Sequence, residues 1–229
     1  VGGKRAIDYF VDDNKIADPL VLADMKLAGT IPTDVVLFNI DSKSEVNGKQ
    51  SKVAIVSVLQ NVFNEMQGFS GSNPFLADLE RKLADEGKYD LFKEKFADSF
   101  GSTWEESRSD FDFIQDDVVD ILAEIDFMSI EAGRNWCEKA SGEYKYKVED
   151  FAKSVKKYLD KQESKHHVVF LIDENGQYIG DDSQLMLNLQ TVTEDLGTEC
   201  GGKAWIIVTS QQDIDSVTKT KGNDFSKIQ

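Results

Sequence analysis

Three short apolar runs, each followed at once by polar residues, stand out in the hydrophobic pattern of this chain. They cover residues 33–41, 166–174 and 203–212, and the middle run reads His-His-Val-Val-Phe-Leu-Ile-Asp-Glu. Consecutive bulky apolar residues over the length of a strand indicate a strand that is buried on both faces, which is typical of parallel sheets. The runs therefore predict a parallel sheet whose carboxyl edge carries polar residues, and this is the edge where α/β proteins bind ligands.

Between the runs, apolar residues recur with the three- and four-residue spacing of amphipathic helices. One helix is predicted to open at Asp18-Pro19, with Asp as its cap and Pro in its first turn, and to stop near Gly29. Residues from about 75 to 165 look helical throughout. Because roughly 120 residues separate the first strand from the second, far more than a simple crossover needs, we predict an inserted helical subdomain in an α/β fold.

The composition argues against two classes of function. The 229 residues carry a formal net charge of −16, whereas a general affinity for nucleic acid needs a surplus of Lys and Arg, so we do not expect direct nucleic-acid binding. No apolar stretch approaches the roughly 18 to 20 residues that cross a bilayer, so no membrane span is expected. Cys137 and Cys200 lack metal-type spacing and are expected to be buried, reduced thiols, which fits a cytoplasmic location.

The two acids that end the second strand, Asp173 and Glu174, are the most informative candidates for chemistry. In P-loop nucleotide hydrolases the first acid of such a pair binds the Mg²⁺ that bridges the nucleotide phosphates, and the second polarises the attacking water. A second interpretation is a core strand whose turn happens to be acidic, which involves no chemistry. A third is an unrelated hydrolase in which the two acids bind a metal ion without a nucleotide.

The end of the third strand favours the nucleotide hypothesis. In the P-loop class with a catalytic glutamate, the strand after the acidic strand lies between it and the phosphate-loop strand, so its tip faces the γ-phosphate. Thr209, Ser210 and Gln211 occupy that tip, and their hydroxyl and amide groups can sense phosphate or orient water. The phosphate loop itself is missing, because G-x-x-x-x-G-K-[ST] occurs nowhere in the chain. For an arginine finger, the candidates are Arg108 and Arg134 in the predicted insertion.

A more specific resemblance is carried by six segments, residues 3–10, 16–25, 38–43, 173–180, 187–191 and 208–213. The most distinctive part is the combination of D-E-x-G-Q-x-I-G with V-T-S-Q-Q. Together these segments resemble the large P-loop ATPases of BREX bacteriophage-exclusion systems, the BrxC/PglY family, and the resemblance runs along essentially the whole chain.

The resemblance implies a cytoplasmic bacterial ATPase that works beside a DNA methyltransferase and other BREX components against phage. It implies that Asp173 is the Mg²⁺ ligand, that Glu174 is the catalytic base, and that Ser210 with Thr209 and Gln211 forms the phosphate sensor. ATP and Mg²⁺ are then cofactors of the full-length protein, and neither is expected to bind to this piece. The phosphate loop is expected upstream of the first residue, so that the chain is an internal fragment.

The resemblance therefore implies an α/β fold with an incomplete parallel sheet of the P-loop NTPase (AAA+-like) type. Residues 1–50 are expected to form the first part of the α/β core, residues 51–165 a mainly helical insertion, and residues 166–229 the part with the acidic (Walker B) and sensor strands. An absent strand would leave the 204–210 strand with an open apolar edge, which favours self-association or pairing with another segment. The expected function is ATP hydrolysis in the full-length protein, with this piece inactive alone; the alternative is a non-catalytic protein-interaction module of the same defence complex.

Overall fold

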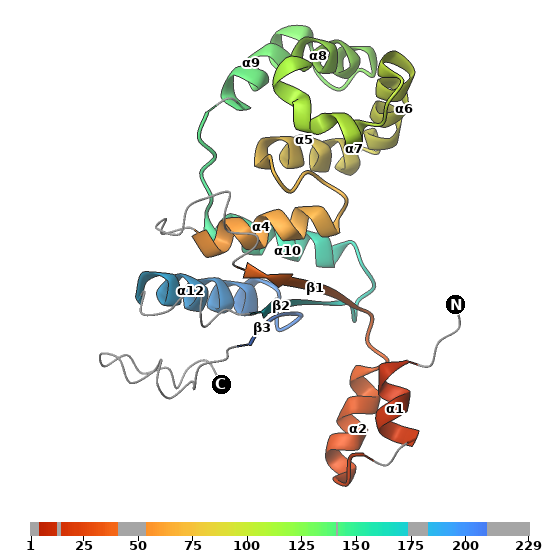
Figure 1. The fold of residues 1–229 in the computed structure, drawn as a ribbon, viewed down its shortest axis with the longest axis vertical. Helices are drawn as coiled ribbons and strands as arrows, with labels where there is room; N and C mark the ends of the chain where they lie inside the picture. Colours follow the sequence, from red (N-terminus) through yellow and green to blue (C-terminus); the bar gives the residue numbers. More distant parts are fainter. Residues whose placement is uncertain (1–4, 13–14, 41–53, 141, 174–182, 210–229) are drawn as a thin grey trace. The chain divides into compact units, whose positions relative to one another are not determined.

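The computed structural model describes residues 5–12, 15–40, 54–140, 142–173 and 183–209 (Figure 1). By its contacts the chain divides into two compact units. The sheet unit comprises residues 1–42 and 148–229, and the helical unit comprises residues 43–147. The division into three segments at residues 50 and 165 stays a prediction.

Three parallel strands form the sheet in the described part of the chain. They are β1 (Thr33–Asn39), β2 (His167–Asp173) and β3 (Ala204–Val208), in the order β1-β2-β3. Each strand coincides with one of the apolar runs, because the β-branched and aromatic residues of those runs fit a pleated, buried surface. The strands, with helices on either side of them in the chain, confirm the predicted α/β class.

Helices α10 (Val148–Asp160) and α12 (Ser183–Glu199) cover one face of this sheet (Figure 1). The ring of Phe151 in α10 lies edge-on to that of Phe170 in β2, with 5.7 Å between the ring centroids. Helix α12 contacts β3 through its apolar stripe. The side chains buried on this face are Val36, Phe38, Val168, Phe170, Ile172 and Ala204.

The opposite face of the sheet is exposed. Val35 and Leu37 of β1 and Trp205 and Ile207 of β3 are all exposed to solvent. The prediction that the strands are buried on both faces is therefore wrong for β1 and β3. The reason is that α10 and α12, the crossover helices described between these strands, both lie on the same side.

A short helical hairpin precedes the sheet. It consists of α1 (Ala6–Asp12) and α2 (Pro19–Ala28). The carboxylate of Asp18 accepts hydrogen bonds from the backbone N–H groups of Leu20 (2.8 Å) and Val21 (3.3 Å), which confirms the predicted helix start. No side chain of α2 is fully buried.

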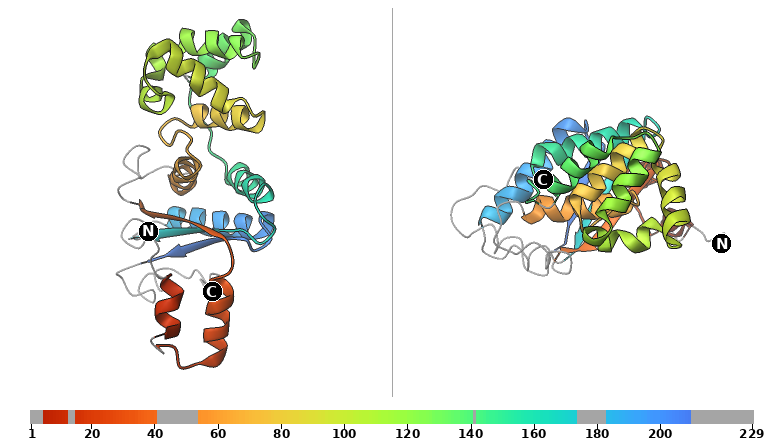
Figure 2. Two further views of the ribbon diagram at one scale, coloured as in Figure 1. Left: turned by 90° about the vertical axis from the view of Figure 1, so that its right-hand side faces the viewer. Right: turned by 90° about the horizontal axis from the view of Figure 1, so that it is seen from above.

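The described part of the helical unit consists of helices and their connections (Figure 2), and it has its own aromatic core. Its described helices are α4 (Ala54–Met66), α5 (Pro74–Asp85), α6 (Tyr89–Phe100), α7 (Trp104–Ser107), the 3₁₀ helix η1 (Arg108–Phe113), α8 (Gln115–Glu124) and α9 (Ile130–Ala140). Trp104 is fully buried at the centre of this core. Phe92 and Phe96 lie edge-on to it at centroid distances of 5.1 and 5.2 Å, a geometry that aromatic rings prefer. Within the described residues, no helix is long and apolar enough to cross a membrane.

Both cysteines are buried thiols, as predicted. Cys137 belongs to α9 and Cys200 directly follows α12. Burial raises the pKa of both thiols, that of Cys200 to about 11. Both therefore stay protonated at neutral pH and behave as small apolar side chains.

Candidate functional site

Two of the predicted site residues, Asp173 and Thr209, lie at the carboxyl edge of the sheet. Asp173 is the last residue of β2, and Thr209 directly follows β3. In the register, Asp173 pairs with Asn39, the last residue of β1. Because all three strands are parallel, their polar ends meet at this one edge. Glu174, Ser210 and Gln211, the other predicted site residues, lie outside the described residues.

The side chains of Asp173 and Thr209 are in direct contact. The Oγ1 hydroxyl of Thr209 donates a hydrogen bond to Oδ1 of Asp173. The backbone N–H of Thr209 donates to the carbonyl oxygen of Ile172 at 2.9 Å, which extends the β2–β3 pairing by one residue. The hydroxyl thus orients a carboxylate that is exposed to solvent at the edge of the sheet.

An exposed carboxylate of this kind suits a hard cation. Mg²⁺ prefers oxygen ligands and is usually bound through one or two carboxylates together with water and substrate phosphates. Among the described residues, no group of three or more His, Cys, Asp or Glu side chains could hold a metal ion. A Mg²⁺ site of the nucleotide type does not require such a group, so Asp173 fits the role of a single carboxylate ligand.

A second polar cluster lies at the opposite, amino edge of the sheet. Oδ2 of Asp34 in β1 accepts a hydrogen bond from the Tyr158 hydroxyl of α10 and is also 2.6 Å from Nε2 of His166, the residue before β2. Burial alone would raise the pKa of Asp34, but the hydrogen bonds and the charge of His166 lower it below its ordinary value. These hydrogen bonds link β1 to α10 and to the start of β2.

Sequence reasoning missed this cluster. Asp34 and His166 are 132 residues apart, and no local motif connects them. The only available signal was a charged residue next to the apolar run of β1, and a charge at that position is usually solvated.

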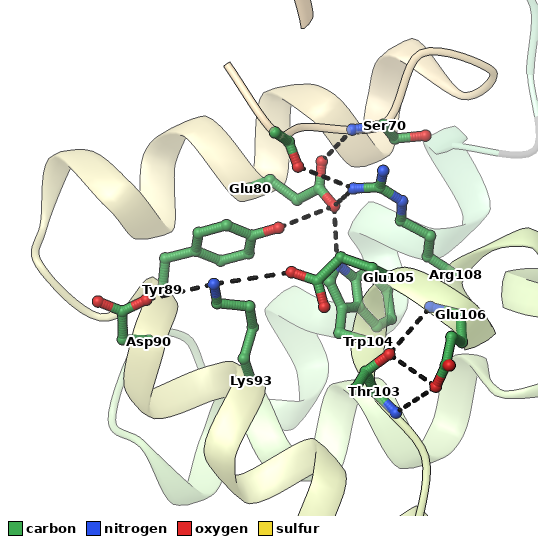
Figure 3. Close-up of polar contacts among 11 residues, drawn as sticks. Ser70, Glu80, Tyr89, Asp90, Lys93, Thr103, Trp104, Glu105, Glu106 and Arg108 are labelled. Atoms are coloured by element: carbon green, nitrogen blue, oxygen red, sulfur yellow. Dashed lines mark hydrogen bonds and ion pairs between the residues drawn. The ribbon is translucent and has the colours of Figure 1, made fainter. Parts of the chain in front are cut away.

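A third cluster surrounds a fully buried carboxylate in the helical unit (Figure 3). Oε1 of Glu80 accepts hydrogen bonds from Nε1 of Trp104 (2.7 Å), Nη1 of Arg108 (3.0 Å) and the Tyr89 hydroxyl (3.2 Å). Oε2 accepts from the backbone N–H of Ser70 at 2.5 Å. Burial and the negative charge of Glu80 raise the pKa of Tyr89, so its hydroxyl remains a donor. Both oxygens of this carboxylate accept hydrogen bonds from neighbouring residues, so we assign Glu80 a structural role in the core.

The same contacts bear on the two arginine-finger candidates. Nη1 of Arg108 donates both to Glu80 and to the carbonyl oxygen of Gly68, at 3.0 and 3.1 Å. Its guanidinium is therefore hydrogen-bonded to groups within the helical unit. Arg134 is exposed, and its Nε lies 4.0 Å from Oδ1 of Asp116, which is also exposed.

Comparisons with known proteins leave the family of the chain open. No family model matches it, and no solved structure is significantly similar to it. The function has to be argued from the residues of the carboxyl edge themselves.

Proposed function

We propose that this chain is part of a P-loop ATPase of the BREX type and supplies the acidic and sensor strands of its ATP site. The observation that carries the proposal is the contact between Asp173 and Thr209 across the carboxyl ends of two neighbouring parallel strands. An acid that ends one strand and a hydroxyl that ends the next are the pair expected beside the γ-phosphate. The full-length protein would act in the cytoplasm beside a DNA methyltransferase and other BREX components.

The order of the strands supports the proposal. The acidic strand β2 is central, and the sensor strand β3 is at the edge of the described sheet. This order leaves the outer side of β3 as the place for a phosphate-loop strand, as the P-loop arrangement requires. A groove of about 320 Å³ lies between α12 and β3, and its lining includes Leu189, Leu196 and Ile206.

Each residue has a distinct role in the proposed site. Mg²⁺ and ATP, when bound, supply the electrophilic γ-phosphate and neutralise its charge. Asp173 would hold the cation, and the hydroxyl of Thr209 orients its carboxylate. Glu174 accepts a proton from the attacking water, and Ser210 and Gln211 contact the phosphate or the water.

The experiment is a substitution of the proposed base in the full-length protein. Glu174→Gln should lower kcat for ATP hydrolysis by about 10²-fold to 10⁴-fold, because general-base catalysis contributes on that scale. Binding of a fluorescent ATP analogue should be retained, since the amide keeps the size of the carboxylate. Phosphate release and fluorescence titration measure the two quantities.

The matched control is Glu163→Gln. Glu163 is exposed and lies just before β2, at the other end of the same strand. This variant should hydrolyse ATP at the parent rate. Undiminished hydrolysis by the Glu174→Gln variant would refute the assigned base, and loss of activity in both variants would point to misfolding.

A second candidate function is a non-catalytic interaction module of the same complex. The exposed apolar side chains of β1 and β3 favour it, because surfaces of this kind are commonly used for docking. In that case the full-length protein would bind no ATP and both variants would behave like the parent. Mg²⁺ binding at Asp173 without any nucleotide affinity would instead favour the metal-dependent hydrolase.

A further inference from the structure

The exposed face of the sheet forms a continuous apolar surface. Two rows of paired residues cross it, Val35–Val169–Trp205 and Leu37–Leu171–Ile207. Leu37 is 67% exposed and Trp205 is 55% exposed, while the central Val169 and Leu171 are partly buried. Parallel sheets are almost always covered on both faces, so this surface requires a partner.

A matching apolar stripe lies on α2, immediately before β1 in the chain. Leu20, Ala23 and Leu27 recur at the spacing that places them on one side of a helix. Leu20 is 77% exposed and Leu27 is 63% exposed, whereas Leu22 and Met25 of the same helix are partly buried. Two apolar surfaces that no other described residues cover are therefore adjacent in the sequence.

The connection between the two surfaces is long enough for them to meet. Four residues, Gly29 to Pro32, join α2 to β1. Four extended residues span up to about 13 Å, and connections of two to six residues are usual between a helix and the strand it packs on. Helix α2, with ten residues, is about 15 Å long and can lie along β1, whose seven residues span about 23 Å.

The handedness of crossover connections selects the face. The connections from β1 through α10 to β2 and from β2 through α12 to β3 run in one direction across the sheet, and both helices lie on the same face. Parallel crossovers are right-handed in nearly all proteins, so two crossovers in one direction place their helices on one face. Because α10 and α12 already occupy that face, the surface open to the helix before β1 is the other face.

We propose that the α1–α2 hairpin is the cover of the open sheet face, with Leu20 and Leu27 packed on Leu37, Leu171 and their neighbours. This contact would place the hairpin under the two strands that end in Asp173 and Thr209. The proposal does not depend on the nucleotide chemistry, because it rests on the exposed apolar surfaces, the length of the connection and the helices that occupy the opposite face.

A disulfide test in the intact chain examines this contact. The pair Leu20→Cys with Leu171→Cys should form an intramolecular disulfide under mild oxidation, identified by mass spectrometry of the linked peptides. The control pair is Val21→Cys with Leu171→Cys, because Val21 is exposed but lies a third of a turn away from the stripe. Efficient linkage of the first pair and little linkage of the second is the expected result. Equal linkage, no linkage or an intermolecular disulfide would overturn the proposal.

A second measurement avoids substitution in the central strand. A cysteine introduced by Ile207→Cys on β3 should react slowly with a maleimide, since the hairpin covers it. Adding Leu20→Asp and Leu27→Asp should accelerate the reaction about tenfold or more, because a charged stripe cannot stay docked and the site opens. Equally fast labelling with and without the two Asp substitutions would show that the hairpin leaves this face uncovered.

Discussion

Glu80 shows how one buried charge can organise a helical core. Its carboxylate is fully buried and accepts hydrogen bonds from residues of α6, α7 and η1 and from the segment before α5. A buried charge is tolerated only when it is paired and hydrogen-bonded, and removal of one partner leaves the other uncompensated.

We therefore expect Glu80→Gln to be strongly destabilising. The amide cannot neutralise Arg108, and its NH₂ group would face the donors that now point at an oxygen. The free energy of unfolding should fall by about 3 kcal/mol, as urea denaturation would measure. Glu86→Gln, an exposed position just after α5, should change it by less than about 0.5 kcal/mol. Similar effects of the two substitutions would contradict the central role of Glu80.

The lowered pKa of Asp34 predicts that this residue contributes to folding stability in a pH-dependent way. Its pKa is lower in the folded protein than in the unfolded chain, so the ionised form favours folding. This contribution is fully present above the unfolded pKa near 4 and is lost as the pH falls through the folded pKa.

Asp34→Asn tests that contribution. At pH 7 the substitution should lower the free energy of unfolding by about 1 to 2 kcal/mol, because Tyr158 and His166 lose their charged acceptor. As the pH falls below about 4 the difference from the parent should shrink, because Asp34 is protonated first in the unfolded chain and, at lower pH, also in the folded protein. Denaturant titrations at several pH values measure it. A difference that stays constant down to pH 2 would show that the charge of Asp34 is irrelevant.

At the scale of elements, Gly133 sets the distance between α8 and α9. A Cβ atom at this position would lie 2.9 Å from Cγ1 of Val119, closer than real contacts allow. Val is stiff at χ1 and cannot rotate away easily. The two helices therefore approach each other through a glycine in a helix interior.

Gly133→Ala should consequently destabilise the helical unit, although Ala favours helix by about 1 kcal/mol at an exposed site. Overpacking costs about 1 to 3 kcal/mol, and thermal denaturation would show a lower Tm. Combining it with Val119→Ala should cost less than the sum of the two single changes, because the clash is removed. Strict additivity would mean that the two side chains do not compete for space.

Periodicity predicted the elements well because it reflects burial. The apolar run that forms β1 and the cap at Asp18 are local signals, and both the strand and the cap are present in the structure. The Asp34–His166 pair and the donors around Glu80 depend on residues far apart in the chain, so no window of sequence contains them. At the candidate site, the shared edge of Asp173 and Thr209 followed from parallel strands, whereas their direct hydrogen bond required coordinates.

At the scale of the whole molecule, the absence of a phosphate-loop motif predicts how this chain behaves alone. Without convergent backbone N–H groups and a lysine to neutralise the β-phosphate, Asp173 and Thr209 cannot retain a nucleotide. Isothermal calorimetry of the 229-residue chain with Mg²⁺ and ATP should therefore give no measurable heat of binding. A micromolar Kd would mean that the phosphates bind elsewhere in the chain.

The pairing of Asn39 with Asp173 has a mechanical consequence. Only three residues separate Asn39 from Lys43, where the helical unit begins. Since the chain is continuous here, a pull on the helical unit would act along the backbone of β1 that pairs with Asp173.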